Sequence, residues 1–304
     1  MDNKKTGKSG SSRQTAAELY EVQPYYERYN QKYNMTRRGQ WEEAEREIGK
    51  KRINNLEKRV LSGINGYTTL DWAFFKGAHT NVENTGFNVN RPNMFGNSWE
   101  PISRHSRAGR YPAPDLSLER WQGSPEDASR ILKKMSVDYY GADMAGFCLL
   151  DRRWVYSHWF DEENKKDYPI KFSDEPGYES YTVPTQLEDK TQVIPKEMKY
   201  VVALIFEMDK DAIAAAPTVT QMAGTRLAYS RISFTTASVA EFIRGMGYNA
   251  IPSANCTALS IPLAVDAGLG AAGQECQAYQ SCFWSAVSHL EGYHRPASGG
   301  GQAD

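Results

Sequence analysis

A long helical pattern from Thr218 to Met246 constrains the fold of this chain more than any other feature of its sequence. Side chains with an apolar part recur there at spacings of three or four residues, which places them on one face of a helix. They are Met222, Thr225, Tyr229, Ile232, Thr236, Val239, Ile243 and Met246. Gly247 follows as a glycine typical of helix C-termini. The pattern therefore predicts one long helix with a buried stripe.

Shorter apolar runs on both sides of this helix predict strands. Met144–Leu150 and Tyr200–Met208 are short, continuous and apolar, as buried central strands are. Asn249–Pro252 predicts another short strand, and a helix at about Ala258–Ala267 follows it. Ser124, followed by Pro125 and two acidic residues, predicts a helix start and a helix that reaches about Tyr140. Together these elements predict an α/β (α+β) fold.

The rest of the chain is more polar. The first fourteen residues are basic, rich in Gly and Ser, and predicted to be disordered. Residues 41–62 predict an exposed helix with one buried stripe, and residues 80–124 predict a long irregular excursion. That stripe comprises Trp41, Ala44, Ile48, Ile53, Leu56 and Val60. Residues 151–197 are polar and Pro-rich, apart from a dense aromatic patch from Trp154 to Phe160.

Composition excludes several classes of protein. With 304 residues, of which 40% are hydrophobic, the chain can bury a sizeable core, and its net charge of −1 gives no reason to expect nucleic acid as a partner. No apolar run approaches the roughly 18 residues of a membrane-spanning helix. The four cysteines, Cys148, Cys256, Cys276 and Cys282, form no CxxC pair, and the five histidines show no ligand spacing. No zinc or iron–sulfur site is therefore predicted.

Tyr229 lies on the predicted buried stripe, where a phenol must find a hydrogen-bond partner or line a cavity. One interpretation is a core tyrosine bonded to a carbonyl group. The other is a proton donor in a pocket, because an ordinary phenol has a pKa near ~10 and is protonated at neutral pH. Arg226, one helical turn away, would make the phenol a stronger acid if it pointed toward it rather than into solvent.

Three other features also allow a structural and a functional interpretation. The small residues of the long helix, among them Ala223, Gly224 and Ser230, suit either helix packing or the close approach of a flat ligand. Asn255 follows a predicted strand end and is either a turn residue or a site residue. Gly268–Gly273 matches a dinucleotide-binding GxGxxG pattern, but a predicted helix precedes it and too few residues follow for a βαβ unit. A nicotinamide-binding function is therefore rejected.

Four segments in a fixed order carry a family resemblance: GADMAGFC, KYVVALIFEMD, AYS with EFIRGMGYNAIPS, and LAVDAGLG. From about Glu126 to Gly273 the chain resembles the catalytic subunit of corrinoid-dependent reductive dehalogenases of organohalide-respiring bacteria. The resemblance implies a nitroreductase-like core that binds a cobalamin-type cofactor. We therefore divide the chain into a disordered lead (1–14), an N-terminal helical and irregular region (15–124), an incomplete corrinoid-binding core (125–273) and an aberrant tail that we expect to be out of frame (274–304).

The resemblance also implies roles for individual residues. Tyr229 matches the family's proton donor, and Asn255 matches the polar catalytic residue of the following loop. The corrinoid would contact Tyr229, Ser253 and Asn255, and the substrate pocket would be lined by Trp154 and Trp159. The small residues of the long helix would then allow a broad corrin ring to approach. Implied partners are an organohalide, a small membrane anchor protein and an electron donor.

The chain departs from the family after Gly273. Family members continue into a ferredoxin-like region that binds two four-iron, four-sulfur clusters, whose cysteine ligands are missing here. Codons chosen for Gln274–Asp304, read one base later, can spell a segment close to the family's continuation. The hypothesis is a frameshift near codon 274, which would leave Cys276, Cys282, Trp284 and His294 without a chemical role.

From these departures we expect the chain as written to be inactive, and to be cytoplasmic, since Arg37–Arg38 is not followed by the apolar stretch of a twin-arginine signal. Family members are usually exported. Two alternatives remain besides the enzyme. One is a non-catalytic corrinoid-binding module, and the other is a fragment that exposes a large apolar face and does not fold.

Overall fold

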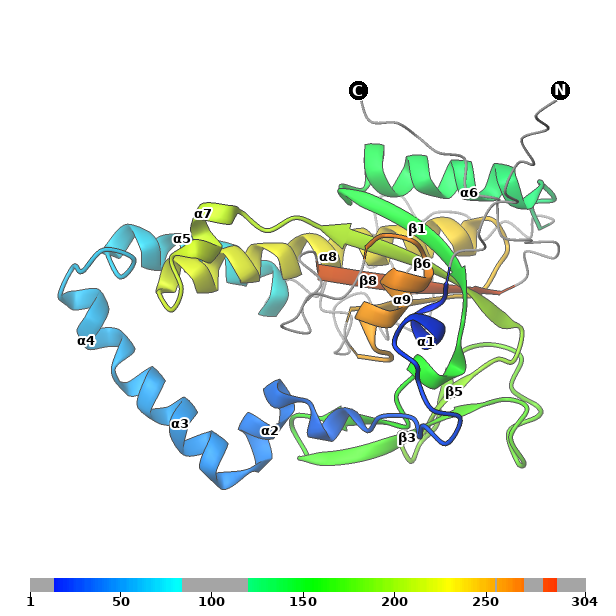
Figure 1. Ribbon diagram of the computed structural model, residues 1–304, viewed down its shortest axis with the longest axis horizontal. Helices are drawn as coiled ribbons and strands as arrows, with labels where there is room; N and C mark the ends of the chain where they lie inside the picture. Colours follow the sequence, from blue (N-terminus) through cyan, green and yellow to red (C-terminus); the bar gives the residue numbers. More distant parts are fainter. Residues whose placement is uncertain (1–13, 84–119, 255, 271–280, 289–304) are drawn as a thin grey trace, which may run out of the picture.

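The computed structural model describes residues 14–83, 120–254, 256–270 and 281–288 (Figure 1). Most of the predicted disordered lead and of the predicted excursion over 80–124 lies outside these residues. So do Asn255, Cys276 and His294.

A four-stranded sheet forms the centre of the fold and confirms the mixed α/β class. Its strands are β1 (Met144–Leu149), β6 (Met198–Phe206), β8 (Ser281–Ser288) and β7 (Ala250–Ser253), in the order β1-β6-β8-β7. Every neighbouring pair is antiparallel. The three strands expected from the sequence are confirmed. Among the described strands β6 is an inner strand as predicted, whereas β1, also expected to be central, lies at an edge. The nitroreductase-like fold type stays a prediction.

Strand β8 lies within the segment predicted to be out of frame. Its backbone pairs with β6 along Met198–Phe206 and with β7 along Ala250–Ser253. Backbone hydrogen bonds are available to almost any sequence, so this pairing does not test the origin of the tail. The frameshift stays a prediction.

Helices cover both faces of the sheet. The side chains of β6 alternate between these two faces, so that β6 contributes to the core on each side. Val202, Leu204 and Phe206 belong to one cluster of buried side chains, which we call the α8 cluster because α8 (Val219–Gly245) contributes Ile232, Val239 and Ile243 to it. Val201 and Ala203 face the opposite cluster, called the α9 cluster, to which α9 (Ser260–Asp266) contributes Leu263 and Val265.

The boundaries of the long helix are those expected from its sequence. Thr218 caps the N-terminus of α8 by accepting a hydrogen bond from the Gln221 backbone N–H. Gly247 follows the helix with a φ of +87°, in the left-handed region that favours glycine. Helix α6 (Pro125–Lys134) also begins as predicted, with Ser124 accepting from the Asp127 N–H, and a π-helical segment (Met135–Tyr139) extends it.

The small residues in the first half of α8 allow other helices to approach it. Helix α5 (Thr69–Glu83) runs along α8, and α7 (Lys210–Ala214) lies beside it (Figure 1). The Ser230 hydroxyl donates to the Ala78 carbonyl of α5 at 2.6 Å. A Cβ at Gly224 would lie 2.9 Å from the Ala212 Cβ of α7. At these positions the small side chains therefore serve helix packing.

The helix predicted over 41–62 is wrong in its continuity and in its buried stripe. The chain forms α2 (Met35–Trp41), α3 (Glu43–Asn54) and α4 (Leu56–Leu61), which follow one another in an arch outside the central body (Figure 1). Glu42 interrupts the helix with extended backbone. Ile48, a member of the predicted stripe, is 63% exposed. The apolar residues of this segment are spaced as on a helix, but none of the core clusters formed by the described residues includes Ile48.

A second sheet forms within residues 151–197, where the sequence predicted no strands. It contains β2 (His158–Asp161), β3 (Lys166–Phe172), β5 (Gln192–Ile194) and β4 (Thr185–Gln186), in that order. Short segments complete the described chain: α1 (Ala16–Leu19) and the 3-10 turns Gln31–Tyr33 and Arg152–Trp154.

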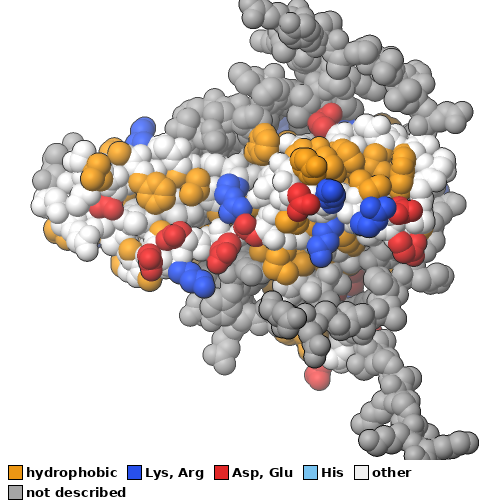
Figure 2. Space-filling view, turned by 90° about the horizontal axis from the view of Figure 1, so that it is seen from above, with side chains coloured by type: hydrophobic (Ala, Val, Ile, Leu, Met, Phe, Trp, Pro, Cys, Tyr) orange, Lys and Arg blue, Asp and Glu red, His pale blue; other side chains and the backbone are white. Residues whose placement is uncertain are grey.

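Two surface properties concern possible partners. On the face seen in Figure 2, the coloured acidic and basic side chains are interspersed, in keeping with the net charge of −1. Within the described ranges, no helix has both the length and the apolar character needed to cross a membrane.

Candidate functional site

The end of β7 and the loop that follows it form the predicted cofactor-binding segment, in which Ser253, Ala254 and Thr257 are buried and Cys256 is half-buried. Ser253 is 0% exposed, Ala254 3% and Thr257 1%. The Cys256 sulfur lies 3.6 Å from the Ser253 hydroxyl and 3.6 Å from the Thr257 hydroxyl. The loop thus groups uncharged polar side chains on both sides of Asn255, which itself lies outside the described residues.

Backbone contacts tie this loop to the aromatic patch about a hundred residues earlier in the chain. The Tyr156 N–H donates to the Thr257 carbonyl at 2.9 Å, and the Leu259 N–H donates to the Trp154 carbonyl at 2.8 Å. Between them, Val155 and Ala258 form an isolated antiparallel bridge. The structure therefore brings two segments together that sequence analysis singled out separately.

Trp154 lies within the α9 cluster and is 4% exposed. Its indole N–H donates to Asp266 Oδ2 at 2.9 Å, while Asp266 Oδ1 accepts from the Ala16 N–H at 2.6 Å. The Tyr26 ring packs edge-on against the indole at 5.9 Å. These contacts join the N-terminal segment, the aromatic patch and α9. A substrate-lining role for Trp154 stays a prediction.

Trp159 lies on β2 of the second sheet and packs against the α9 cluster. Its indole N–H donates to the Lys190 carbonyl at 3.0 Å, and its ring stacks on Tyr168 with the ring centres 5.2 Å apart. These contacts fix the indole against β3 and the segment before β5. Its role in a substrate pocket also stays a prediction.

The carboxylate of Asp161 stabilises the same corner of the second sheet. It accepts hydrogen bonds from Lys190 Nζ at 2.6 Å and from Asn164 Nδ2 at 2.7 Å, and Asp161 is only 9% exposed. Burial by itself raises the pKa of this carboxyl, but the hydrogen bonds from Lys190 and Asn164 outweigh burial and lower it to about 2.

A stability that depends on pH follows from this lowered pKa. Because the folded-state value lies below the ordinary one, the carboxylate stabilises the fold above about pH 4, by roughly 2 kcal/mol, and this contribution is lost as pH falls through about 2. Urea unfolding of the unchanged chain and of Asp161→Asn should therefore differ most at neutral pH and converge in strong acid. A difference that stays constant from pH 7 down to the acid limit would contradict this assignment.

Tyr229 lies on α8, half-buried, and packs against the α8 cluster. Ala254 belongs to the same cluster, and Cys256 packs against it. The predicted proton donor and the residues on both sides of Asn255 thus border one group of buried side chains. Arg226 is also half-buried one turn before Tyr229. Its assistance to the phenol stays a prediction.

Sequence analysis missed two residues of this region, Tyr156 and Arg28. The Tyr156 side chain is 3% exposed, and burial raises the pKa of its phenol; the nearby Cys256 thiol acts in the same direction. The Arg28 guanidinium donates hydrogen bonds to the backbone carbonyls of Val155, Tyr156 and Ile170. A single partly buried arginine has no periodic pattern in a sequence, so only the contacts identify it.

The described residues do not fit an iron–sulfur cluster. Cys148 is buried and Cys256 half-buried, both as free thiols, whereas each four-iron cluster takes four cysteine thiolates. Among the residues that the structure describes, no three His, Cys, Asp or Glu side chains are grouped to hold a metal ion.

Comparison with known proteins identifies relatives of this chain. The family model for the reductive dehalogenase subunit matches residues 51–282. Tetrachloroethene reductive dehalogenase of Desulfitobacterium hafniense is 33% identical over 181 residues, which are 53% of this chain and 32% of that protein. The Dehalobacter restrictus enzyme of the same name is 32% identical over 181 residues, with the same coverage.

A third relative matches a shorter part of the chain. Tetrachloroethene reductive dehalogenase of Sulfurospirillum multivorans is 32% identical over 151 residues, 46% of this chain and 29% of that protein. The chain thus spans about a third of the length of the curated relatives that it matches.

Proposed function

Because this chain belongs to the reductive dehalogenase subunit family, a family of oxidoreductases, we propose that it forms the part of such an enzyme that binds a corrinoid and protonates the carbon from which halide leaves. We assign this function to residues 125–273. The observation that carries the proposal is the convergence of Tyr229 and the loop after β7 on the α8 cluster.

The side chains of the site suit a corrinoid. The edge of a corrin ring carries amide groups, which need uncharged donors and acceptors rather than ions. The hydroxyls of Ser253 and Thr257, the Cys256 thiol and the Tyr229 phenol are groups of this kind, and Asn255 would add an amide. Ser253 is fully buried against Cys256, which suits a role in shaping the loop. Contact of its hydroxyl with the corrinoid is part of the proposal.

When bound, the reduced corrinoid supplies the electrons that break the carbon–halogen bond. In the overall reaction, two electrons and one proton replace the halogen by hydrogen, and the halide leaves with the bonding electron pair. Tyr229 is the proton donor in this proposal, because α8 carries its phenol to the border of the cluster shared with the loop. Asn255 would orient the reacting groups, and Trp154 and Trp159 would limit the substrate pocket.

The substrate is an organohalide, and the remaining partners proposed are a membrane anchor protein and an electron donor. The curated relatives are named for tetrachloroethene, which makes that compound a suitable first probe. Association with the membrane through such an anchor is part of the proposal.

A non-catalytic corrinoid-binding module is the second candidate. It rests on the uncharged polar side chains of the loop after β7, which suit a corrinoid with or without electron transfer. Such a module would use the same loop and the same cluster without transferring electrons.

Cobalamin binding tests the proposal first. The unchanged chain should retain about one cobalamin per chain in equilibrium dialysis, and Asn255→Ala should weaken binding roughly tenfold, the cost of one hydrogen bond. Asn249→Ala is the matched control, because Asn249 precedes β7 and its amide donates to the Thr182 carbonyl instead. If the unchanged chain retains no cobalamin, the corrinoid function is wrong for this chain. Binding without halide release in the presence of titanium(III) citrate would favour the second candidate.

A further inference from the structure

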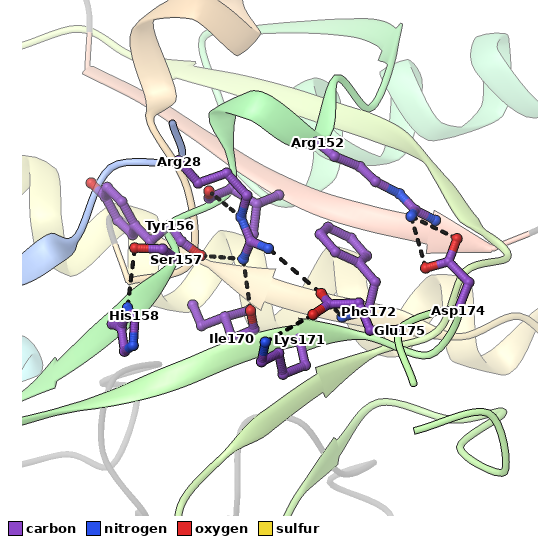
Figure 3. A network of polar contacts seen from close by, with 11 residues as sticks. Arg28, Arg152, Tyr156, Ser157, His158, Ile170, Lys171, Phe172, Asp174 and Glu175 are labelled. Atoms are coloured by element: carbon purple, nitrogen blue, oxygen red, sulfur yellow. Dashed lines mark hydrogen bonds and ion pairs between the residues drawn. The ribbon is translucent and has the colours of Figure 1, made fainter. Parts of the chain in front are cut away.

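The guanidinium of Arg28 holds three backbone carbonyls from two separate segments. Its Nε donates to the Val155 carbonyl at 3.2 Å, and its Nη2 donates to the carbonyls of Tyr156 at 2.6 Å and Ile170 at 2.7 Å (Figure 3). Val155, Tyr156 and Ile170 are each at most 3% exposed. These carbonyls therefore depend on protein donors rather than on bulk water.

Arg28 is itself held in position. Its Nη1 lies 3.8 Å from Glu175 Oε1, and its guanidinium carbon lies 5.2 Å from the centre of the Phe172 ring. Glu175 is fixed in turn by Lys171 Nζ at 2.9 Å and by the Phe172 N–H at 3.0 Å. The arginine side chain is 23% exposed, so its hydrogen bonds are partly shielded from competing water.

One peptide group connects Arg28 to the loop after β7. The carbonyl of Val155 accepts from Arg28, and the N–H of the same peptide group, on Tyr156, donates to the Thr257 carbonyl at 2.9 Å. A cation at the oxygen of a peptide group polarises it and strengthens the bond that its N–H donates. The guanidinium thus acts on the loop through a single peptide.

We propose that Arg28 is a positioning residue for the loop after β7, holding Cys256 and Thr257 in place through the Val155–Tyr156 peptide. This inference rests on the proposed function only in assigning that loop to the corrinoid. The N-terminal region would then belong to the site, although Arg28 lies 127 residues before Val155 in the sequence.

Arg152 offers a matched control. Its guanidinium lies 4.2 Å from the centre of the same Phe172 ring, on which Arg28 also stacks (Figure 3). It donates to both carboxylate oxygens of Asp174, at 2.8 and 2.7 Å, and not to the carbonyls that Arg28 holds. Arg152→Met removes a cation from the same ring without removing a donor to the Val155–Tyr156 peptide.

The test uses two cysteines of the chain as reporters. Cys256 lies in the loop, whereas Cys148 lies buried on β1 in the α9 cluster. Iodoacetamide labelling, followed residue by residue by mass spectrometry, measures how often each thiol becomes accessible. We expect Arg28→Met to raise the labelling rate of Cys256 by about tenfold or more, the effect of one lost charge-assisted hydrogen bond on local opening, and that of Cys148 by less than about twofold. Arg152→Met should change neither rate by more than about twofold.

Several outcomes would overturn the inference. An equal rise at Cys256 and Cys148 would make Arg28 a general structural residue, and an unchanged Cys256 rate would show that it does not hold the loop. If Arg28→Met does not fold, the test is repeated with Arg28→Lys, and Arg152→Lys is its control. The same criteria apply, because one ammonium group cannot reproduce a guanidinium that donates to three carbonyls.

Cobalamin binding separates this inference from the proposed function. Failure of the unchanged chain to bind cobalamin, with Cys256 still released by Arg28→Met, would contradict the proposed function and leave the positioning of the loop intact. If the unchanged chain binds cobalamin and the Kd of Arg28→Met is within about twofold of its Kd, Arg28 has no role in the site. A Kd raised about tenfold or more would support it.

Discussion

Replacing Ile232 with alanine should lower the free energy of unfolding by about 2–5 kcal/mol. Ile232 is 0% exposed and belongs to the part of the α8 cluster that α8 itself contributes. The substitution removes buried methyl and methylene groups and leaves a cavity that the closely packed α8 cluster fills only in part. Urea denaturation followed by tryptophan fluorescence measures the change.

The same substitution at Ile48 is the matched control. Ile48 also lies on a helix, α3, and was expected on a buried stripe, but it is 63% exposed. Ile48→Ala should therefore change the free energy of unfolding by less than about 0.5 kcal/mol. A loss above about 1.5 kcal/mol would show that another part of the protein covers α3 in solution.

Replacing Tyr229 with phenylalanine should reduce halide release from tetrachloroethene by about 10²- to 10⁴-fold, the usual contribution of a positioned proton donor. The ring and its packing against the α8 cluster stay in place, and only the hydroxyl is lost. The assay uses the cobalamin-loaded chain under anaerobic conditions with titanium(III) citrate, which supplies both electrons without iron–sulfur clusters. Chloride is measured, and the rate of free cobalamin is subtracted.

Tyr248→Phe controls for the loss of a phenol from the same cluster. Tyr248 is 9% exposed, and its hydroxyl donates to the Trp121 carbonyl at 2.7 Å, beyond the C-terminus of α8. Its removal should cost about 1 kcal/mol of stability and leave halide release within about twofold of the unchanged chain. If both variants release chloride at the unchanged rate, Tyr229 is not the proton donor.

The elements of the central core were predictable because their patterns are local. The apolar spacing along α8, the cap at Thr218 and the glycine at position 247 agree with one helix. The continuous apolar runs of β1 and β6 likewise mark strands buried on both faces. Of the site, family resemblance marked Tyr229 and the loop after β7, and both border the α8 cluster; their roles stay predictions.

The second sheet and the exposure of Ile48 on α3 were not predictable from such patterns. Strands β2, β4 and β5 have only 4, 2 and 3 residues, and β3 contains Lys, Asp and Pro, so that their sequences resemble loops. Ile48 has the spacing of a buried position but lies where the chain arches away from the core. Periodicity shows which side chains share a face, and it does not show whether another layer covers that face.

From its sequence alone this chain is an α/β protein of a recognisable family, with one long amphipathic helix beside buried strands. Those properties depend on residues a few positions apart, whose spacing is the same in the unfolded chain. The contacts that build the site join distant residues: Asp266 with Ala16, Arg28 with Val155, and Tyr156 with Thr257. Each pairs a single donor with a single acceptor and leaves no pattern along the sequence. They form only when the packed layers bring the segments together.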